Sequence, residues 1–286
     1  MPQAEAIETP GAEARMLLEA IGDPRRDVIA ASDVAVVIAH PDDETIGCGA
    51  QLGRLRGRIV ILVTDGAPRN GTDARRSGFA APEAYAAARH HELLVALRHA
   101  GVSADALTSL NVPDQQAALH LVDIARQLAD CFSRCRIHVV LTHAYEGGHP
   151  DHDATAFAVH AGAALLGRTG HVISVIEMPL YRAGPEGPAR QSFPTDSGIS
   201  EIAVALDERW RMLKEKMVAA HASQQSVLRD FSLDTEKFRL APAHDFTKLP
   251  NDGRLLYETM PWGMTGERWL ELTAAALREL GIERRA

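Results

Sequence analysis

A continuous run of small and β-branched apolar residues, Val34-Ala35-Val36-Val37-Ile38-Ala39, is the feature that most constrains the fold. Because such a strand has no polar face, it is expected to be buried on both sides, as the strands of parallel sheets are. A second apolar run over 59–63 follows a segment that predicts a helix over about 46–55. We therefore predict a parallel sheet connected by crossover helices.

The alternation of strands and helices continues along the chain. Further strands are expected near 106–110, 137–141 and 172–178, and helices near 82–99, 116–133, 152–167, 207–222 and 266–280. Right-handed crossovers between such strands predict an α/β fold: a Rossmann-like, doubly wound, mostly parallel sheet flanked by helices in a single domain. We expect an N-terminal extension over 1–30, the core over 31–226 and a C-terminal extension packed on it over 227–286. Segments 183–199 and 229–264 predict, respectively, a loop or loose hairpin and a mixed region rich in turns.

Composition excludes several classes of protein. The net charge is −8, from 38 acidic and 30 basic residues, which argues against nucleic acid as the main partner because phosphate binding needs a concentrated basic surface. No segment approaches the ~20 apolar residues of a transmembrane helix, and no secretory signal is evident. Three cysteines, an odd number, fit a reducing cytoplasm. We expect a cytoplasmic protein; the sequence carries no signal for its oligomeric state.

Two polar clusters contain the side chains suited to catalysis. His40-Pro41-Asp42-Asp43-Glu44 directly follows the first strand, and His149-Pro150-Asp151-His152-Asp153 follows the strand that ends at Leu141. Ligands of such sheets bind beyond the carboxyl ends of the strands, so we expect both clusters at one rim. Imidazole and carboxylate groups suit zinc, and a catalytic zinc usually takes three protein ligands and leaves a place for water. One His-Pro-Asp segment alone could be a turn, but two at one rim favour a metal site.

The paired motifs AHPDDE and HPDHDA, about 110 positions apart, resemble those of the PIG-L/LmbE family of zinc N-deacetylases. The similarity covers about residues 33–226 and includes Thr64-Asp65-Gly66, Arg89-x-x-Glu92, Pro113-Asp114, Lys216 and His221-Ala-Ser223-Gln224. The resemblance implies a Zn²⁺-dependent hydrolase that cleaves a linear amide C–N bond. Its expected substrate is a small molecule, an N-acetylglucosamine-type amino sugar or a conjugate of one, from which it releases acetate and a free amine.

The resemblance also implies roles for residues of the two motifs. His40, Asp43 and His152 match the zinc ligands. Asp42 matches the general base that activates water. His149 matches the residue that stabilises the developing oxyanion or helps to protonate the leaving amine.

Further roles follow from the same resemblance. Asp151 is expected to orient a histidine, and Arg89 and Asp114 match positions that contact the sugar. Some relatives use as an acid a tyrosine two residues before the second motif, where this chain has Gly147. Tyr145 lies two residues further back, so a catalytic tyrosine stays open.

Two alternative functions are considered. Gly47-Cys48-Gly49 and Gly53 suggest a nucleotide-dependent oxidoreductase, but the spacing is G-x-G-x-x-x-G and a bulky charged segment precedes it, so close helix–sheet packing explains these glycines better. A catalytically inactive sugar-binding relative is the other alternative, and the presence of every expected ligand and of Asp42 argues against it.

Trp262 is interpreted either as a platform for a sugar ring or as a cover of the core. The remaining histidines that we considered lack comparable surroundings and are interpreted as surface or core residues: His90, His91, His138, His143, His171 and His244.

Overall fold

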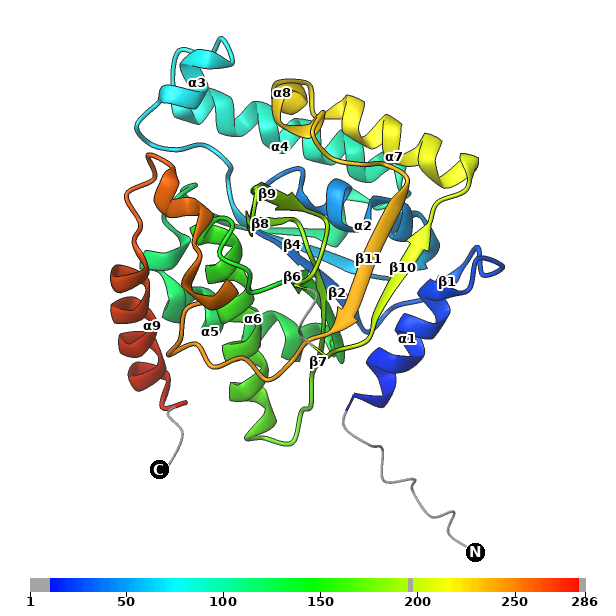
Figure 1. The fold of residues 1–286 in the computed structure, drawn as a ribbon. Coiled ribbons are helices and arrows are strands. Elements are labelled where there is room, and N and C mark those ends of the chain that lie inside the picture. The colour runs from blue at the N-terminus through cyan, green and yellow to red at the C-terminus, as the bar shows by residue number, and fades with distance from the viewer. Residues whose placement is uncertain (1–10, 195–197, 283–286) are drawn as a thin grey trace, which may run out of the picture.

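Seven strands form the central sheet, in the order β10-β11-β7-β6-β2-β4-β5 (Figure 1). The computed structural model describes residues 11–194 and 198–282. The strands are β2 (Val34–Ile38), β4 (Ile59–Thr64), β5 (Leu107–Val112), β6 (Val139–His143), β7 (Ser174–Met178), β10 (Glu201–Ala205) and β11 (Thr235–Leu240). The five strands from β7 to β5 run parallel, whereas β11 and β10 are each antiparallel to their neighbours. The predicted α/β fold with a mostly parallel sheet is confirmed.

Helices cover both faces of this sheet (Figure 1). One face is covered by α1 (Ala12–Gly22), α2 (Asp43–Arg54), α4 (Pro82–His99) and α7 (Glu208–Ala220), and the other by α5 (Leu121–Cys135), α6 (Pro150–Gly167) and α9 (Gly266–Leu280). Side chains of β2 alternate between the two: Ala35 and Val37 pack with the α5–α6–α9 face, and Val36 with the α2–α4 face. This two-sided burial is why the strand has no polar position.

Smaller elements complete the chain. They are the strand pairs β1 (Ile29–Ala30) with β3 (Leu55–Arg56) and β8 (Tyr181–Gly184) with β9 (Gly187–Arg190), and the short helices α3 (Thr72–Arg76) and α8 (Gln225–Leu228). The pair β8–β9 is a hairpin inside the region expected to be a loop or loose hairpin, of which 195–197 lie outside the described residues. Within the described ranges, no helix combines the length and apolarity needed to cross a membrane. The cytoplasmic location stays a prediction.

The start of α2 differs from the expectation. The helix begins at Asp43 rather than near residue 46, so Asp43 and Glu44 occupy its first turn. Carboxylates are favoured there because the first turn carries the positive end of the helix dipole. By contrast, α4 and α9 have the expected bounds, and Gly281 ends α9 in the left-handed conformation at φ 64°.

Strands β10 and β11 were not expected from the sequence. The segment of β11, Thr-Glu-Lys-Phe-Arg-Leu, has no apolar run by which a buried strand could be recognised. Two of its charged residues are nevertheless buried, each against an oppositely charged partner from another element. Glu236 pairs with Lys214 of α7 at 3.0 Å, and Arg239 pairs with Glu177 of β7 at 2.8 Å. The sheet thus includes a strand from the predicted C-terminal extension, and the boundary at 226 stays a prediction. Residues 1–10 of the predicted N-terminal extension lie outside the described part.

The strand order places a crevice beside β2. The chain continues from β2 to β4 and β5 on one side, and then returns to β6 and β7 on the other. Such a reversal of strand order is where ligands of open α/β sheets bind, beyond the carboxyl ends of the strands. His40 follows the carboxyl end of β2, and His143 ends β6 beside it. Both predicted motifs therefore meet at this crevice.

Candidate metal centre

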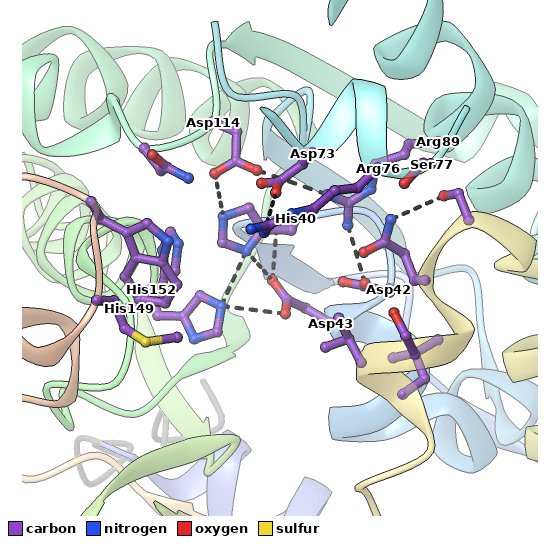
Figure 2. A pocket seen from close by; sticks show the side chains of 18 of the residues that line it. His40, Asp42, Asp43, Asp73, Arg76, Ser77, Arg89, Asp114, His149 and His152 are labelled. Atoms are coloured by element: carbon purple, nitrogen blue, oxygen red, sulfur yellow. Dashed lines mark hydrogen bonds and ion pairs between the residues drawn. The ribbon is translucent and has the colours of Figure 1, made fainter. Parts of the chain in front are cut away.

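The three predicted ligands converge on one point (Figure 2). His40 Nδ1 lies 3.1 Å from His152 Nε2 and 3.4 Å from an Asp43 oxygen, and the other Asp43 oxygen lies 3.4 Å from His152 Nε2. Zinc bonds of ~2.0–2.1 Å in tetrahedral geometry place ligand atoms roughly 3.3 Å apart. The donor set and its separations therefore fit a single small divalent ion. These ligands come from the end of β2 and the first turns of α2 and α6.

A buried carboxylate orients the first of these ligands. His40 Nε2 lies 3.2 Å from Asp151 Oδ2 and 3.4 Å from Asp114 Oδ1. Asp151 is itself fixed, because its two oxygens accept hydrogen bonds from the backbone N–H groups of Gln115 at 2.6 Å and Ala117 at 3.0 Å. A proton on Nε2 can be donated to Asp151 and leaves the Nδ1 lone pair directed at the centre, an arrangement that metal-ligating histidines commonly adopt.

His149 occupies the N-cap position of α6 and lines the same crevice. Its Nδ1 accepts a hydrogen bond from the backbone N–H of Asp151 at 3.1 Å, so the proton of the neutral ring lies on Nε2. Burial, aided by the neighbouring His40 and His152, holds the pKa of His149 well below its ordinary value. The ring is therefore a neutral hydrogen-bond donor at neutral pH.

Asp42 lies beside the predicted metal ligands in a strained backbone conformation, with φ at 136°. Such strain in a residue other than glycine is often found at functional sites. Arg89 donates hydrogen bonds to Asp42 Oδ2 at 3.1 Å, to the carbonyl of Pro41 at 2.8 Å and to that of Gly66 at 2.6 Å. Burial raises the pKa of Asp42 to about 7, although Arg89 acts in the opposite direction. Arg89 thus positions the carboxylate expected to act as the base.

A pocket of about 590 Å³ opens onto this centre. Its walls include every predicted site residue except Asp151, which lies beneath His40. Trp262 also lines the pocket, and its ring lies 4.2 Å from that of His149. Polar residues of the 70–77 segment form a further wall: Asn70, Thr72, Asp73, Arg76 and Ser77. The cavity therefore combines a candidate metal centre, aromatic rings and polar groups.

Comparison with known proteins agrees with this geometry. Residues 35–163 match the family model described as PIG-L: GlcNAc-PI de-N-acetylase. The chain carries a PIG-L family domain. A similar curated protein is the 1D-myo-inositol 2-acetamido-2-deoxy-alpha-D-glucopyranoside deacetylase of Corynebacterium efficiens, 29% identical over 237 residues that cover 67% of this chain and 71% of the relative.

Solved structures share the fold of this chain. The deacetylase of the antimicrobial A40926 pseudoaglycone superposes with a TM-score of 0.56 at 20% identity, covering 73% of this chain and 96% of that one. The zinc-inhibited form of a teicoplanin deacetylase gives a TM-score of 0.53 at 17% identity, covering 74% and 97%. At these identities the likeness concerns the fold alone.

One histidine of the PIG-L domain contacts the centre although its sequence surroundings gave no sign of it. His143 is fully buried, and its ring stacks on that of His152 with centroids 4.3 Å apart. Its Nε2 accepts the backbone N–H of Ala39 at 2.8 Å and lies 3.4 Å from an Asp43 oxygen. His143 is thus a core histidine that supports two ligands. The signal available in the sequence was the position of His143 at the end of the strand that lies beside β2.

Tyr145 and Tyr181 differ in their relation to the pocket. The hydroxyl of Tyr145 donates to the carbonyl of Lys248 at 2.9 Å and accepts from Trp269 Nε1 at 2.7 Å, so it joins the C-terminal segment to the sheet. Tyr181, by contrast, lines the pocket with its ring 5.1 Å from that of His152. Neither role was predicted.

The glycines of α2 allow close packing, as expected. A Cβ at Gly47 would lie 2.3 Å from Met178 Sδ, and one at Gly53 would lie 2.5 Å from Leu213 Cδ2. The first turn of the same helix holds the carboxylates of Asp43 and Glu44, which would repel a pyrophosphate. The geometry therefore argues against a dinucleotide site.

Proposed function

We propose that this protein is a zinc-dependent hydrolase that removes the N-acetyl group from an N-acetylglucosamine-type sugar or a conjugate of one. The observation that carries the proposal is the convergence of His40, Asp43 and His152 within 3.1–3.4 Å of one another, beside Asp42 and His149 in one pocket. The PIG-L domain supports it, as does the similarity to a deacetylase of a 2-acetamido-2-deoxy-glucopyranoside.

Each residue has a distinct role in the proposed reaction. A zinc ion held by His40, Asp43 and His152 would polarise the acetyl carbonyl and lower the pKa of water. Asp42 removes the proton of the attacking water, and the Nε2–H of His149 faces the oxygen on which negative charge develops. Because an amine leaves poorly unless it is protonated, Asp42 returns to the nitrogen the proton that it took from the water, and the neutral ring of His149 serves as a hydrogen-bond donor.

The pocket walls suit a sugar rather than a purely apolar substrate. Asp114 offers carboxylate oxygens to hydroxyl groups, and the rings of Tyr181 and Trp262 provide apolar faces. Arg89 is the weaker of the two predicted sugar contacts, because it donates to three acceptors of the protein itself. We propose that Asp114 contacts the sugar and that Arg89 acts mainly by holding Asp42.

An acetate-release screen of the zinc-loaded protein tests this function. The substrates are N-acetylglucosamine, its inositol conjugate and an N-acetylglucosaminyl lipid, and Asp42→Asn serves as the matched control because it keeps the shape of the site. We expect equal amounts of acetate and free amine from at least one substrate, and far less from the control. Sugar binding with no acetate from any substrate would instead identify an inactive relative. Equal release by the control would exclude Asp42 as the base.

A further inference from the structure

A second group of metal-ligating side chains lies between the sheet and α6. It consists of His160 of α6, Glu177 of β7 and His244, which follows β11. One ligand atom from each lies within 4.8 Å of the other two. We propose that these residues form a second binding site for a divalent transition metal, with Zn²⁺ as its best-matched ion. The proposal does not depend on the deacetylase activity.

The donor set is the one that suits zinc. Two imidazole nitrogens and a carboxylate oxygen are available, as at the first centre. The side chain of Glu177 is fully buried; its Oε2 accepts from Arg239 Nε at 2.8 Å, whereas its Oε1 contacts His244 Nε2. The rings of His160 and His244 are nearly perpendicular, with centroids 5.1 Å apart. Small side-chain movements would bring all three ligand atoms to bonding distance of one ion.

A purely structural network explains only part of this group. Arg239 Nε and His244 Nε2 each bond one oxygen of Glu177, so both oxygens of that carboxylate have a partner. His160 Nε2 is different, because it is buried and has no hydrogen-bond partner among the described residues. An unsatisfied buried polar group costs ~1–3 kcal/mol, so such an atom calls for a ligand or another explanation. Burial also lowers the pKa of His160 to about 4, which keeps the ring neutral and able to ligate at neutral pH.

An ion could reach this group from solvent. His160 and His244 line a pocket of about 620 Å³, distinct from the first, with apolar walls that include Phe157, Phe246 and Leu277. Access of this kind is a requirement for a metal site. Figure 1 shows the segment after β11 crossing from the sheet past α6 toward α9. An ion here would therefore tie the C-terminal segment to α6 and β7.

The charge balance predicts that the second site binds more weakly than the first. Arg239 offsets the single negative charge of Glu177, and a divalent cation is repelled by the guanidinium. At the first centre several buried carboxylates lie close to the predicted metal position, and Arg89 pairs with two of them, Asp42 and Asp114. The four carboxylates are those of Asp42, Asp43, Asp114 and Asp151. Binding at the second site should consequently need a higher free zinc concentration.

Metal stoichiometry tests the proposal directly. Tag-free protein is dialysed to equilibrium against a series of buffered zinc concentrations, and bound zinc per chain is measured by mass spectrometry. We expect the wild-type chain to bind two equivalents, and His160→Phe and His244→Phe to bind one each. His91→Ala, which removes an exposed histidine of α4, is the matched control and should keep two. Two independent variants keep the test usable if one fails to fold.

Thermal unfolding provides a second readout. An ion that binds only the folded state stabilises that state. Zinc should therefore raise the Tm of Asp43→Ala, which lacks a ligand of the first centre. The double variant Asp43→Ala/His160→Phe should show no such rise. A wild-type chain that saturates at one equivalent would overturn the second site, and so would His160→Phe and His244→Phe proteins that both retain two.

Discussion

The two histidine–carboxylate clusters offer the same donor atoms in different surroundings. The first lies at the rim of the sheet, where its ligands share a pocket with Asp42 and His149. The second lies between β7 and α6, with Arg239 bound to its carboxylate. From this comparison we expect that ligand type alone does not define a catalytic centre. A base and a hydrogen-bond donor must face the same cavity, and the local charge must favour a cation. The following predictions test this contrast.

Loss of a ligand from the first cluster should have the largest effect. Asp43→Ala removes one of the three groups that converge at the rim, and a bound metal contributes several kcal/mol to such reactions. We expect turnover to fall at least about 10³-fold, which is the change in rate produced by losing several kcal/mol of transition-state stabilisation. Acetate release and bound zinc are measured together.

The matched change in the second cluster is His160→Phe. It should leave turnover within about twofold of wild type, because the ring contacts of His160 among the described residues are with His244 and Phe246 rather than with the first cluster. If His160→Phe were as inactive as Asp43→Ala, the distinction between a catalytic and a non-catalytic cluster would fail.

Loss of the base should separate chemistry from metal binding. Asp42→Asn keeps the size of the side chain and an oxygen for Arg89, but it cannot accept a proton from water. We expect turnover to fall by ~10²–10⁴-fold, the usual contribution of general acid–base catalysis. Zinc content, measured by mass spectrometry, should match that of wild type. A zinc-free Asp42→Asn protein would mean that Asp42 is itself a ligand.

The sequence predicted the parallel part of the fold and the first cluster for a common reason. Strand β2 is buried on both faces, so every one of its residues is apolar and the strand is evident from local sequence. His40 and Asp43 lie three residues apart and directly follow it, so one motif contains two of the three predicted ligands. The signal in each case is local.

What could not be predicted depends on partners distant in sequence. Glu236 and Arg239 give β11 the sequence pattern of an exposed segment. The charges that pair with these two residues come from α7 and β7, so local sequence does not reveal them. The sequence likewise gives no signal of a metal site at His160 or His244, since neither has a polar motif around it. Their proximity follows from how α6 and the segment after β11 pack on β7. Only the folded chain reveals such pairings.

A smaller effect is expected from the residue that orients His40. Asp151→Asn keeps the size of the side chain, but it leaves one oxygen for the backbone N–H groups of Gln115 and Ala117 and weakens the charge-assisted contact with His40 Nε2. Changes of this kind typically cost ~10–100-fold in metal affinity or activity. Zinc affinity is measured by competition with a chelator. The control is Asp153→Asn, two residues further along α6. Its carboxylate accepts hydrogen bonds from the backbone N–H groups of Glu146 and Gly147 rather than from His40, so this variant should keep its zinc affinity.

Tyr145, whose ring lies 5.5 Å from that of His244, should affect stability rather than turnover. Tyr145→Phe removes the hydroxyl that joins the carbonyl of Lys248 to Trp269 Nε1, leaving both without this partner. We expect the free energy of unfolding, measured in urea, to fall by ~1–3 kcal/mol, the cost of unsatisfied buried polar groups. The kcat should stay unchanged, because the hydroxyl is directed at the C-terminal segment and not at the pocket. A kcat loss at unchanged stability would instead make Tyr145 the catalytic tyrosine and extend the first cluster toward the second.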